Sequence, residues 1–416
     1  MFSSFAMIGL FIGTGVFLAV CVLQDISSNV SLSVERSLLS PVVSFQGVSG
    51  VRRREKQGLM PLEIHADIDN YIANHLPEPD HLTLSKVYAK SSLMPDNTGD
   101  GMEGTSPSRY VVLTFANAEY FENLLISNWI CSLRARGIDN FVVIPIDEKA
   151  AKAAEELDDS TLPPDSIFWD PNYWMIDGNA KKRKNSSFSG QLRKGFKPTE
   201  IFIEFIWRRA QLVRTLFNRY PDLNVVLSDA DTTWAYRPWD VVPEYFNQSN
   251  SCDMFFTNDI DYLETEEPLR TVEPLSGFIM IRNREVIREL YLKWVKAALV
   301  FHEKDQPSLR AALQTFKMKY LVGPEEYAEP KGKHPLVLCT LDRERFPTIQ
   351  SLETGAYAER YHNRTDRIAL YHPNFADKKL KPSFFKNYSQ WYVDEASESK
   401  TCSSENKQMN VVTMHQ

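Results

Sequence analysis

Two aspartates separated by one residue, Asp229 and Asp231, come directly after a short apolar run. The run Val225–Leu227 has the length and composition of a single buried strand. Side chains two positions apart in an extended segment point the same way, so both carboxylates would face one point beyond the strand. Two converging carboxylates repel each other unless a cation lies between them. The pair therefore predicts a site for a hard divalent cation and the phosphate oxygens of a substrate.

The spacing alone is a weak signal, because most Asp-x-Asp sequences are turns or solvated loop tips. The surrounding residues favour the metal–diphosphate interpretation. A buried strand precedes the pair, the aromatic residues Trp234, Tyr236 and Trp239 follow it, and Pro238 ends the segment. Open α/β sheets bind ligands outside the carboxyl ends of their strands, which is where the pair would lie.

The elements that must position this pair follow an α/β order. Val111–Phe115 and Phe141–Ile146 are predicted strands, and apolar residues at helical spacing predict a helix over Tyr120–Arg136 between them. This βαβ unit predicts a parallel sheet. Thr114 and Asn117 would lie at the carboxyl end of the first strand, where a nucleotide base or ribose binds. An equally good interpretation makes Asn117 a helix cap.

Further elements are predicted from the same periodicities. In chain order they are a helix over Thr199–Tyr220, strands over Asp253–Asp259 and Ser276–Arg282, a helix over Arg284–Phe301, and strands over Leu336–Leu341 and Ile368–Tyr371. Gly277 would let the backbone approach a bound ligand closely.

Three segments resemble one known family. SDADTTWAYRPW, residues 228–239, resembles the SDxDxxWxxxP signature of the nucleotide-diphospho-sugar transferases, glycosyltransferase family 77. The run TFANAEYFENLLISNWICSLRARGIDNFVVIPID is similar to the opening of that family, and SGFIMIR is similar to a later strand. The resemblance covers about Tyr110–Trp391. It implies an α/β protein with the GT-A fold, a Rossmann-like, mostly parallel sheet flanked by helices, in a type II membrane protein.

The resemblance also implies roles for residues far from the aspartate pair. A late histidine completes the metal site of GT-A enzymes, and His372 in YHPNF stands at that position, although a lone histidine is usually a polar loop residue. Lys378 and Lys381 follow within reach of a diphosphate. The family carries a cationic residue on the helix before the aspartate strand, which either Arg208 or Arg209 would match.

Asp305 and Gln306 are the candidate catalytic residues. They match the start of the DQxxxN element of related retaining transferases, whose Asp or Gln borders the reacting sugar carbon. Arg310 stands where that element has Asn, which is a departure on the acceptor side. Asp305 could also be a helix N-cap with Pro307 in the first turn, and both interpretations can hold together.

The implied activity is transfer of a sugar from a UDP-sugar to a glycan or glycoprotein hydroxyl, with retention of configuration, as in xylosyl-, galactosyl- or arabinosyltransferases. Asp229, Asp231 and His372 would hold Mn²⁺, or Mg²⁺, and Asp229 would also contact the donor. One alternative is an inactive relative that binds glycans or partners, which the change at Arg310 would suit. A second is a phosphoryl-transfer enzyme, which the lack of a P-loop disfavours.

The N-terminal residues predict a membrane anchor. Phe5–Leu23 carries no charge, and its nineteen residues would span about 28 Å as a helix. We interpret it as an uncleaved signal anchor, with a cleaved signal peptide as the alternative. Residues 1–4 would then be a cytosolic tail, 24–108 a stem, 109–395 the GT-A domain and 396–416 a disordered tail. Five N-x-[ST] sequons favour a lumenal body, and the resemblance implies a single-pass type II protein of the Golgi membrane.

Composition limits the partners and the redox state. A net charge of −7 over 416 residues argues against nucleic-acid binding. The five cysteines include no Cys-x-x-Cys, so a zinc site is not expected. In an oxidising lumen Cys131, Cys252, Cys339 and Cys402 could form up to two disulfides, and their spacing leaves all three connectivities open.

Overall fold

The structure is a computed structural model, and it describes part of the chain. The described residues are 72, 76–94, 108–174, 200–242, 245, 252–258, 274–301, 305–316, 318–322, 325–327, 336–341, 345–347, 368–373, 378–396 and 401–403. They belong to one compact unit, Leu62–Gln416. The predicted anchor Phe5–Leu23 lies outside them. None of the described helices is long and apolar enough to cross a bilayer.

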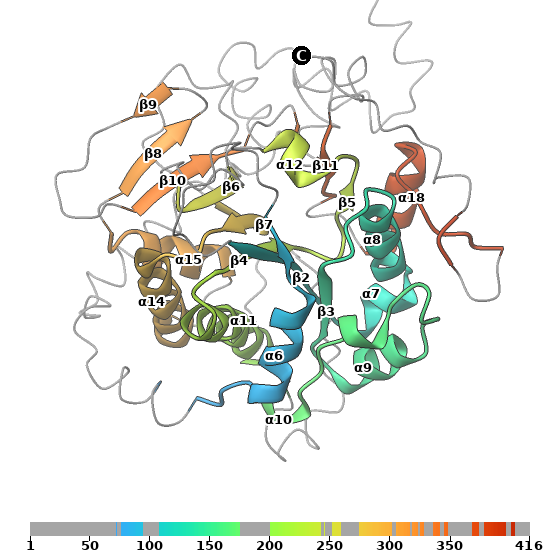
Figure 1. Ribbon diagram of the computed structural model, residues 1–416, viewed down its shortest axis with the longest axis horizontal. Coiled ribbons are helices and arrows are strands. Elements are labelled where there is room, and N and C mark those ends of the chain that lie inside the picture. The colour runs from blue at the N-terminus through green and yellow to red at the C-terminus, as the bar shows by residue number, and fades with distance from the viewer. Residues whose placement is uncertain are drawn as a thin grey trace, which may run out of the picture. The chain divides into compact units, whose positions relative to one another are not determined.

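A nine-stranded sheet organises the described residues (Figure 1). Its strands are β1 (Ser92–Leu93), β2 (Arg109–Ala116), β3 (Phe141–Pro145), β4 (Leu223–Ser228), β6 (Met254–Asn258), β7 (Pro274–Ile281), β8 (Met318–Val322), β9 (Glu325–Tyr327) and β10 (Leu336–Thr340). Their order is β1-β2-β4-β7-β6-β10-β8-β9, and β3 also pairs with β2. Strands β1, β7 and β9 run opposite to the other six. The mostly parallel sheet predicted from the sequence is therefore confirmed.

Helices cover both faces of this sheet. They are α6 (His81–Lys90), α7 (Ala118–Glu122), α8 (Leu125–Arg134), α9 (Glu148–Glu155), α10 (Pro171–Trp174), α11 (Glu200–Arg219), α12 (Pro238–Val241), α14 (Glu285–Phe301), α15 (Asp305–Leu313) and α18 (Lys381–Asn387). Alternate residues of β2 pack against helices on opposite faces of the sheet. Val111 and Leu113 pack with α6, α11 and α14, whereas Val112 packs with α8, because successive strand side chains point to opposite faces.

The helix predicted over Tyr120–Arg136 is two helices, so that prediction was wrong in one respect. The chain breaks at Leu124, whose φ of 57° lies in the left-handed region. Asn123 promotes the break, because its side-chain amide donates to the carbonyl of Glu119 and the backbone amide of Leu124 donates to Phe121. The shorter helix, α7, then projects Tyr120 beside the end of β2.

Part of the predicted stem belongs to the folded domain, which corrects the boundary placed at residue 109. β1 pairs antiparallel with the start of β2, and α6 buries Leu84 and Val87 against the core. Tyr88 of α6 stacks on Tyr220 with ring centroids 4.2 Å apart, and its hydroxyl donates to Asp222 over 2.7 Å. Burial of these apolar and aromatic groups holds α6 on the sheet.

The C-terminal residues return to β5 and α8. β11 (Leu370–Tyr371) pairs with β5 (Thr233–Trp234), and α18 follows. A disulfide joins Cys131 of α8 to Cys402, and a second joins Cys252 to Cys339. This is one of the three connectivities left open above. It fixes residues 401–403, which lie within the segment predicted to be a disordered tail.

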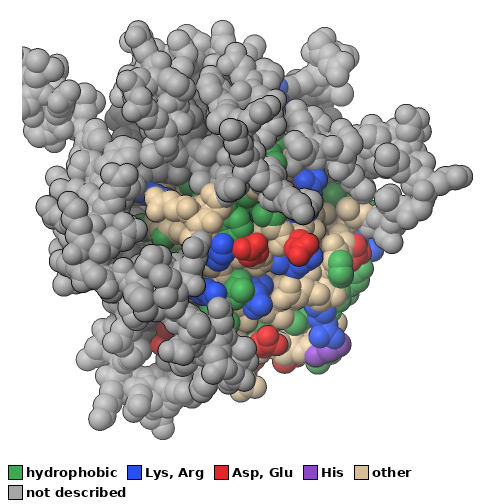
Figure 2. All heavy atoms as spheres, turned by 90° about the vertical axis from the view of Figure 1, so that its left-hand side faces the viewer, with side chains coloured by type: hydrophobic (Ala, Val, Ile, Leu, Met, Phe, Trp, Pro, Cys, Tyr) green, Lys and Arg blue, Asp and Glu red, His purple; other side chains and the backbone are tan. Residues whose placement is uncertain are grey.

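The outer surface mixes both signs of charge. On the described part of the face in Figure 2, basic and acidic side chains lie side by side. On α14, Lys293 and Glu289 form an ion pair whose charged atoms are 3.0 Å apart. Interspersed charge of this kind is typical of a solvated surface.

Candidate metal and donor site

The aspartate pair lies in a turn that is held from three sides. Asp229 follows β4 directly, and its backbone amide donates to the carbonyl of Gly277 on β7 over 2.7 Å. Beneath the turn, Trp129 of α8 donates to the Ser228 hydroxyl over 3.1 Å. Ser228 in turn contacts the Thr232 hydroxyl at 2.7 Å, and Thr232 donates to the Asp229 carbonyl over 2.9 Å. This chain of hydrogen bonds fixes the backbone that carries both carboxylates.

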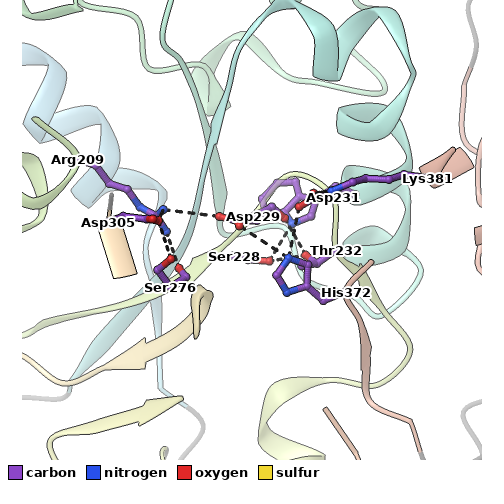
Figure 3. Close-up of polar contacts among 10 residues, drawn as sticks. Arg209, Ser228, Asp229, Asp231, Thr232, Ser276, Asp305, His372 and Lys381 are labelled. Atoms are coloured by element: carbon purple, nitrogen blue, oxygen red, sulfur yellow. Dashed lines mark hydrogen bonds and ion pairs between the residues drawn. The ribbon is translucent and has the colours of Figure 1, made fainter. Parts of the chain in front are cut away.

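Strand pairing brings the histidine to the aspartates. β5 begins two residues after Asp231, and its partner β11 ends directly before His372. The His372 Nε2 atom lies 3.7 Å from Asp231 Oδ1 and 3.8 Å from Asp229 Oδ2 (Figure 3). One ligand atom from each residue lies within 4.8 Å of the others. The structure therefore places the three predicted metal ligands together, although they are far apart in sequence.

The donor set fits a divalent cation. Two carboxylate oxygens and one imidazole nitrogen are ligands that Mn²⁺ accepts. Among the described residues Asp231 Oδ1, although buried, has no hydrogen-bond partner. Gly277 closes the other side, since a Cβ there would lie 2.3 Å from His372 Cε1 and 2.7 Å from Asp229 Oδ2. Gly277, the glycine expected to let the backbone approach a ligand closely, lies against two of the candidate metal ligands.

The two carboxylates differ in their electrostatics. Burial, together with the nearby charges of Asp231 and Asp305, raises the pKa of Asp229 to about 6, against the opposing effect of Arg209. Burial also disfavours the charge on Asp231, but Lys381 forms an ion pair with its Oδ2 atom and, with His372, holds the pKa of Asp231 below its usual range. One carboxylate is thus ion-paired with a lysine, and the other lies at the more exposed rim.

Arg209 connects the aspartate pair to Asp305. Its Nη1 atom lies 3.6 Å from Asp229 Oδ1 and 3.9 Å from Asp305 Oδ2, and its Nη2 atom donates to the Ser276 carbonyl over 3.0 Å. The structure thus settles which arginine of α11 reaches the site. Arg208 instead lies 3.6 Å from Glu204 and stacks over Trp207.

Asp305 is the first residue of α15 and lies at the edge of the same cluster. Its Oδ2 atom accepts a hydrogen bond of 2.6 Å from the Ser276 hydroxyl (Figure 3). Asp305 thus lies in the first turn of α15 and borders the candidate site, while its role as an N-cap stays a prediction. Gln306 follows in the first turn and is half-buried, and its catalytic role stays a prediction.

The residues predicted at the nucleotide side divide into two groups. Lys378 donates to Glu119 over 2.7 Å and to Asn117 over 3.4 Å, and it lies 4.4 Å from the centroid of the Tyr120 ring. Asn117 precedes α7 without a side-chain capping hydrogen bond. Thr114 is fully buried on the face covered by α8, so its side chain has no surface to offer a ligand.

Sequence reasoning missed three polar neighbours of the site, which are Glu119, Tyr120 and Ser276. The negative charges of Asp231 and Asp229 add to burial in raising the pKa of the Tyr120 phenol, which indicates that this ring lies near the acidic pair. The sequence signal that could have found them is their closeness to residues already predicted to border the site. Glu119 and Tyr120 follow Asn117 closely, and Ser276 precedes Gly277.

Comparison with known proteins identifies the class to which this fold and site belong. The nucleotide-diphospho-sugar transferase family matches residues 136–381, more than half of the chain. The chain belongs to this family. The matched residues include all three candidate metal ligands.

Individual relatives are more distant. The chain is similar to β-arabinofuranosyltransferase RAY1 of Arabidopsis thaliana, with 27% identity over 252 residues, and the match covers 61% of this chain but only 40% of that protein. Among solved structures it is similar to mouse xyloside xylosyltransferase 1, with 13% identity, a TM-score of 0.37 and coverage of 64% and 97% of the two chains. It is also similar to the galactosyltransferase LgtC, with 10% identity, a TM-score of 0.36 and coverage of 68% and 97%.

Proposed function

We propose that this glycosyltransferase moves a sugar from a UDP-sugar to a hydroxyl of a glycan or glycoprotein, that it depends on Mn²⁺ or Mg²⁺, and that it retains the anomeric configuration. Family membership supports the transferase class. The observation that carries the metal dependence is the convergence of Asp229, Asp231 and His372 within 4.8 Å. The similarity to an arabinofuranosyltransferase favours a pentose donor.

The chain's own residues suit the roles that this reaction requires. Asp229, Asp231 and His372 would hold the cation, which when bound supplies Lewis-acid stabilisation of the charge on the departing nucleoside diphosphate. Lys378 and Asn117 line the side toward the end of β2, where the nucleoside would lie. Asp305 is held by Ser276 and Arg209. It would either position the donor sugar or attack the anomeric carbon of that sugar as a nucleophile.

The cellular setting is part of the same proposal. We place the enzyme in the Golgi membrane as a single-pass type II protein with its catalytic domain in the lumen. Two disulfides within the described residues support an oxidising compartment.

The test replaces one metal ligand. Asp231→Asn removes a charge with little change in shape and should abolish Mn²⁺-dependent turnover of UDP-sugars, because the remaining oxygen and nitrogen ligands hold a cation weakly. Turnover is measured as UDP release across a panel of UDP-sugars. Asp240→Asn is the matched control, since Asp240 is exposed and contacts only Arg237 among the ion pairs described.

Full activity of Asp231→Asn would contradict the metal assignment. Absence of UDP release with every donor in the wild-type protein would instead favour a non-catalytic family member that binds glycans, for which the Arg310 departure is the specific observation.

A further inference from the structure

The candidate site carries its own cations. Three carboxylates, from Asp229, Asp231 and Asp305, lie close to the guanidinium of Arg209 and the ammonium of Lys381. Arg209 and Lys381 are only 3% and 5% exposed. With a neutral histidine, these groups together carry a single net negative charge. The site is therefore almost neutral before any cation binds.

Lys381 is held in this position by its helix. It is the first residue of α18, and Phe384 and Phe385 of that helix pack with Leu125 of α8 and Tyr371 of β11. Its ammonium contacts Asp231 Oδ2, while Oδ1 of the same carboxylate faces His372 (Figure 3). The ammonium and a cation bound at Oδ1 would thus share one buried carboxylate.

This arrangement penalises a cation that arrives alone. A divalent ion would change the single net negative charge to a net positive one, inside a buried cluster where uncompensated charge is costly. A diphosphate arriving with the cation would bring two ionised phosphates and reverse that sign again. The cost of binding the cation therefore depends on whether the diphosphate is present.

We propose that Lys381 is a positioning residue that occupies Asp231 in place of a cation, so that the cation and the diphosphate of the donor bind cooperatively. The proposal rests on the function proposed above. In this view the ammonium compensates the charge of the buried carboxylate in the empty site and opposes cation binding by charge repulsion. A diphosphate beside it removes that opposition, and by linkage the cation strengthens diphosphate binding equally.

The test measures Mn²⁺ binding rather than turnover. Free Mn²⁺ is counted by electron paramagnetic resonance during titration of the full-length protein, with and without saturating UDP. In Lys381→Gln, Mn²⁺ alone should bind about tenfold tighter than in the wild type, and the tightening produced by UDP should shrink by about the same factor. Lys381→Arg keeps the positive charge and should bind Mn²⁺ alone as weakly as the wild type.

The control lies on the same helix. Lys386 pairs with Glu395 and stacks on Trp391, so Lys386→Gln should leave both Mn²⁺ affinities unchanged. Circular dichroism confirms the fold of each variant.

Two results would overturn the role of Lys381. One is a folded Lys381→Gln that binds Mn²⁺ alone no tighter than the wild type. The other, which needs no glutamine variant, is a Lys381→Arg protein whose affinity for Mn²⁺ alone rises. Failure of the proposed function looks different, because the wild type would then bind no Mn²⁺ in the presence or absence of UDP.

Discussion

Gly277 is the residue through which the sheet touches the candidate metal ligands. It lies on β7, antiparallel to β4, and its carbonyl accepts from the Asp229 amide. Its lack of a side chain leaves the space into which His372 and Asp229 project. The absence of a Cβ at position 277 thus allows the His372 imidazole and the Asp229 carboxylate to lie close together.

Gly277→Ala should therefore weaken cation binding. The added Cβ would lie 2.3 Å from His372 Cε1, so the imidazole must move, and overpacking of this kind costs about 1–3 kcal/mol of stability. We expect Mn²⁺ affinity to fall by about tenfold or more, measured by titration, with a smaller change in the thermal midpoint. An alanine variant with wild-type Mn²⁺ affinity would show that the histidine is not a ligand.

The raised pKa of Asp229 predicts a pH dependence. A pKa of about 6, against an ordinary value of 3.8, means that the folded protein binds this proton more tightly than the unfolded chain does. In the metal-free protein the resulting stabilisation is complete below about pH 3.8 and is lost as the pH rises through about 6. Cation binding shows the opposite trend, because it requires the carboxylate.

Mn²⁺ affinity should accordingly be constant above about pH 6 and fall by up to about tenfold per pH unit below it. Titrations across this range, repeated on Asp229→Asn, check the assignment. A pH profile that is unchanged in the asparagine variant would assign the effect to another group.

At the scale of elements, helix and strand periodicity predicted most of the sheet, including the edge strand β3, but missed β1, β8 and β9. β2, β4, β6, β7 and β10 were found because each is an apolar run that ends at polar residues. α6 was taken for stem, since some of its tertiary partners, such as Tyr220 and Asp222, lie more than a hundred residues away and leave no local pattern. The break at Leu124 was missed because the apolar spacing of α7 and α8 runs through it without interruption.

The candidate site shows the same division between local and distant information. Asp229 and Asp231 could be predicted from their own segment, because two closely spaced carboxylates follow an apolar strand directly. The extended geometry assumed for them was wrong, since both lie in the turn after β4. His372 came only from the resemblance to a family. The ion pair of Lys381 with Asp231, and the choice of Arg209 over Arg208, depend on how α18 and α11 dock, which local sequence does not encode.

At the scale of the whole molecule, the two disulfides close loops of different kinds. Cys131–Cys402 spans 271 residues and ties α8 to the segment after α18, whereas Cys252–Cys339 spans 87 residues between the start of β6 and β10. Asn128 of α8 reinforces the first connection, because it donates to the Gln390 carbonyl and accepts from the Tyr392 amide. The first disulfide therefore secures the chain that carries Lys381.

Replacing either cysteine pair with serine should lower the free energy of unfolding by several kcal/mol, with about 1 kcal/mol more for the longer loop in the chain-entropy model. Urea unfolding measures this. Only the loss of Cys131–Cys402 should also weaken Mn²⁺ binding in the presence of UDP, because that disulfide ties the segment after α18 to α8, on which α18 packs. Equal loss of Mn²⁺ affinity in both double variants would contradict this link.

The pairing of β11 with β5 also sets the timing of assembly during synthesis. A nascent chain presents Asp229 and Asp231 to its surroundings long before His372 leaves the ribosome, since the ligands follow that order along the polypeptide. Until β11 docks beside β5, the acidic turn has neither the imidazole nor the ammonium next to it. The three candidate ligands therefore come together only after the strands of the large sheet have been synthesised.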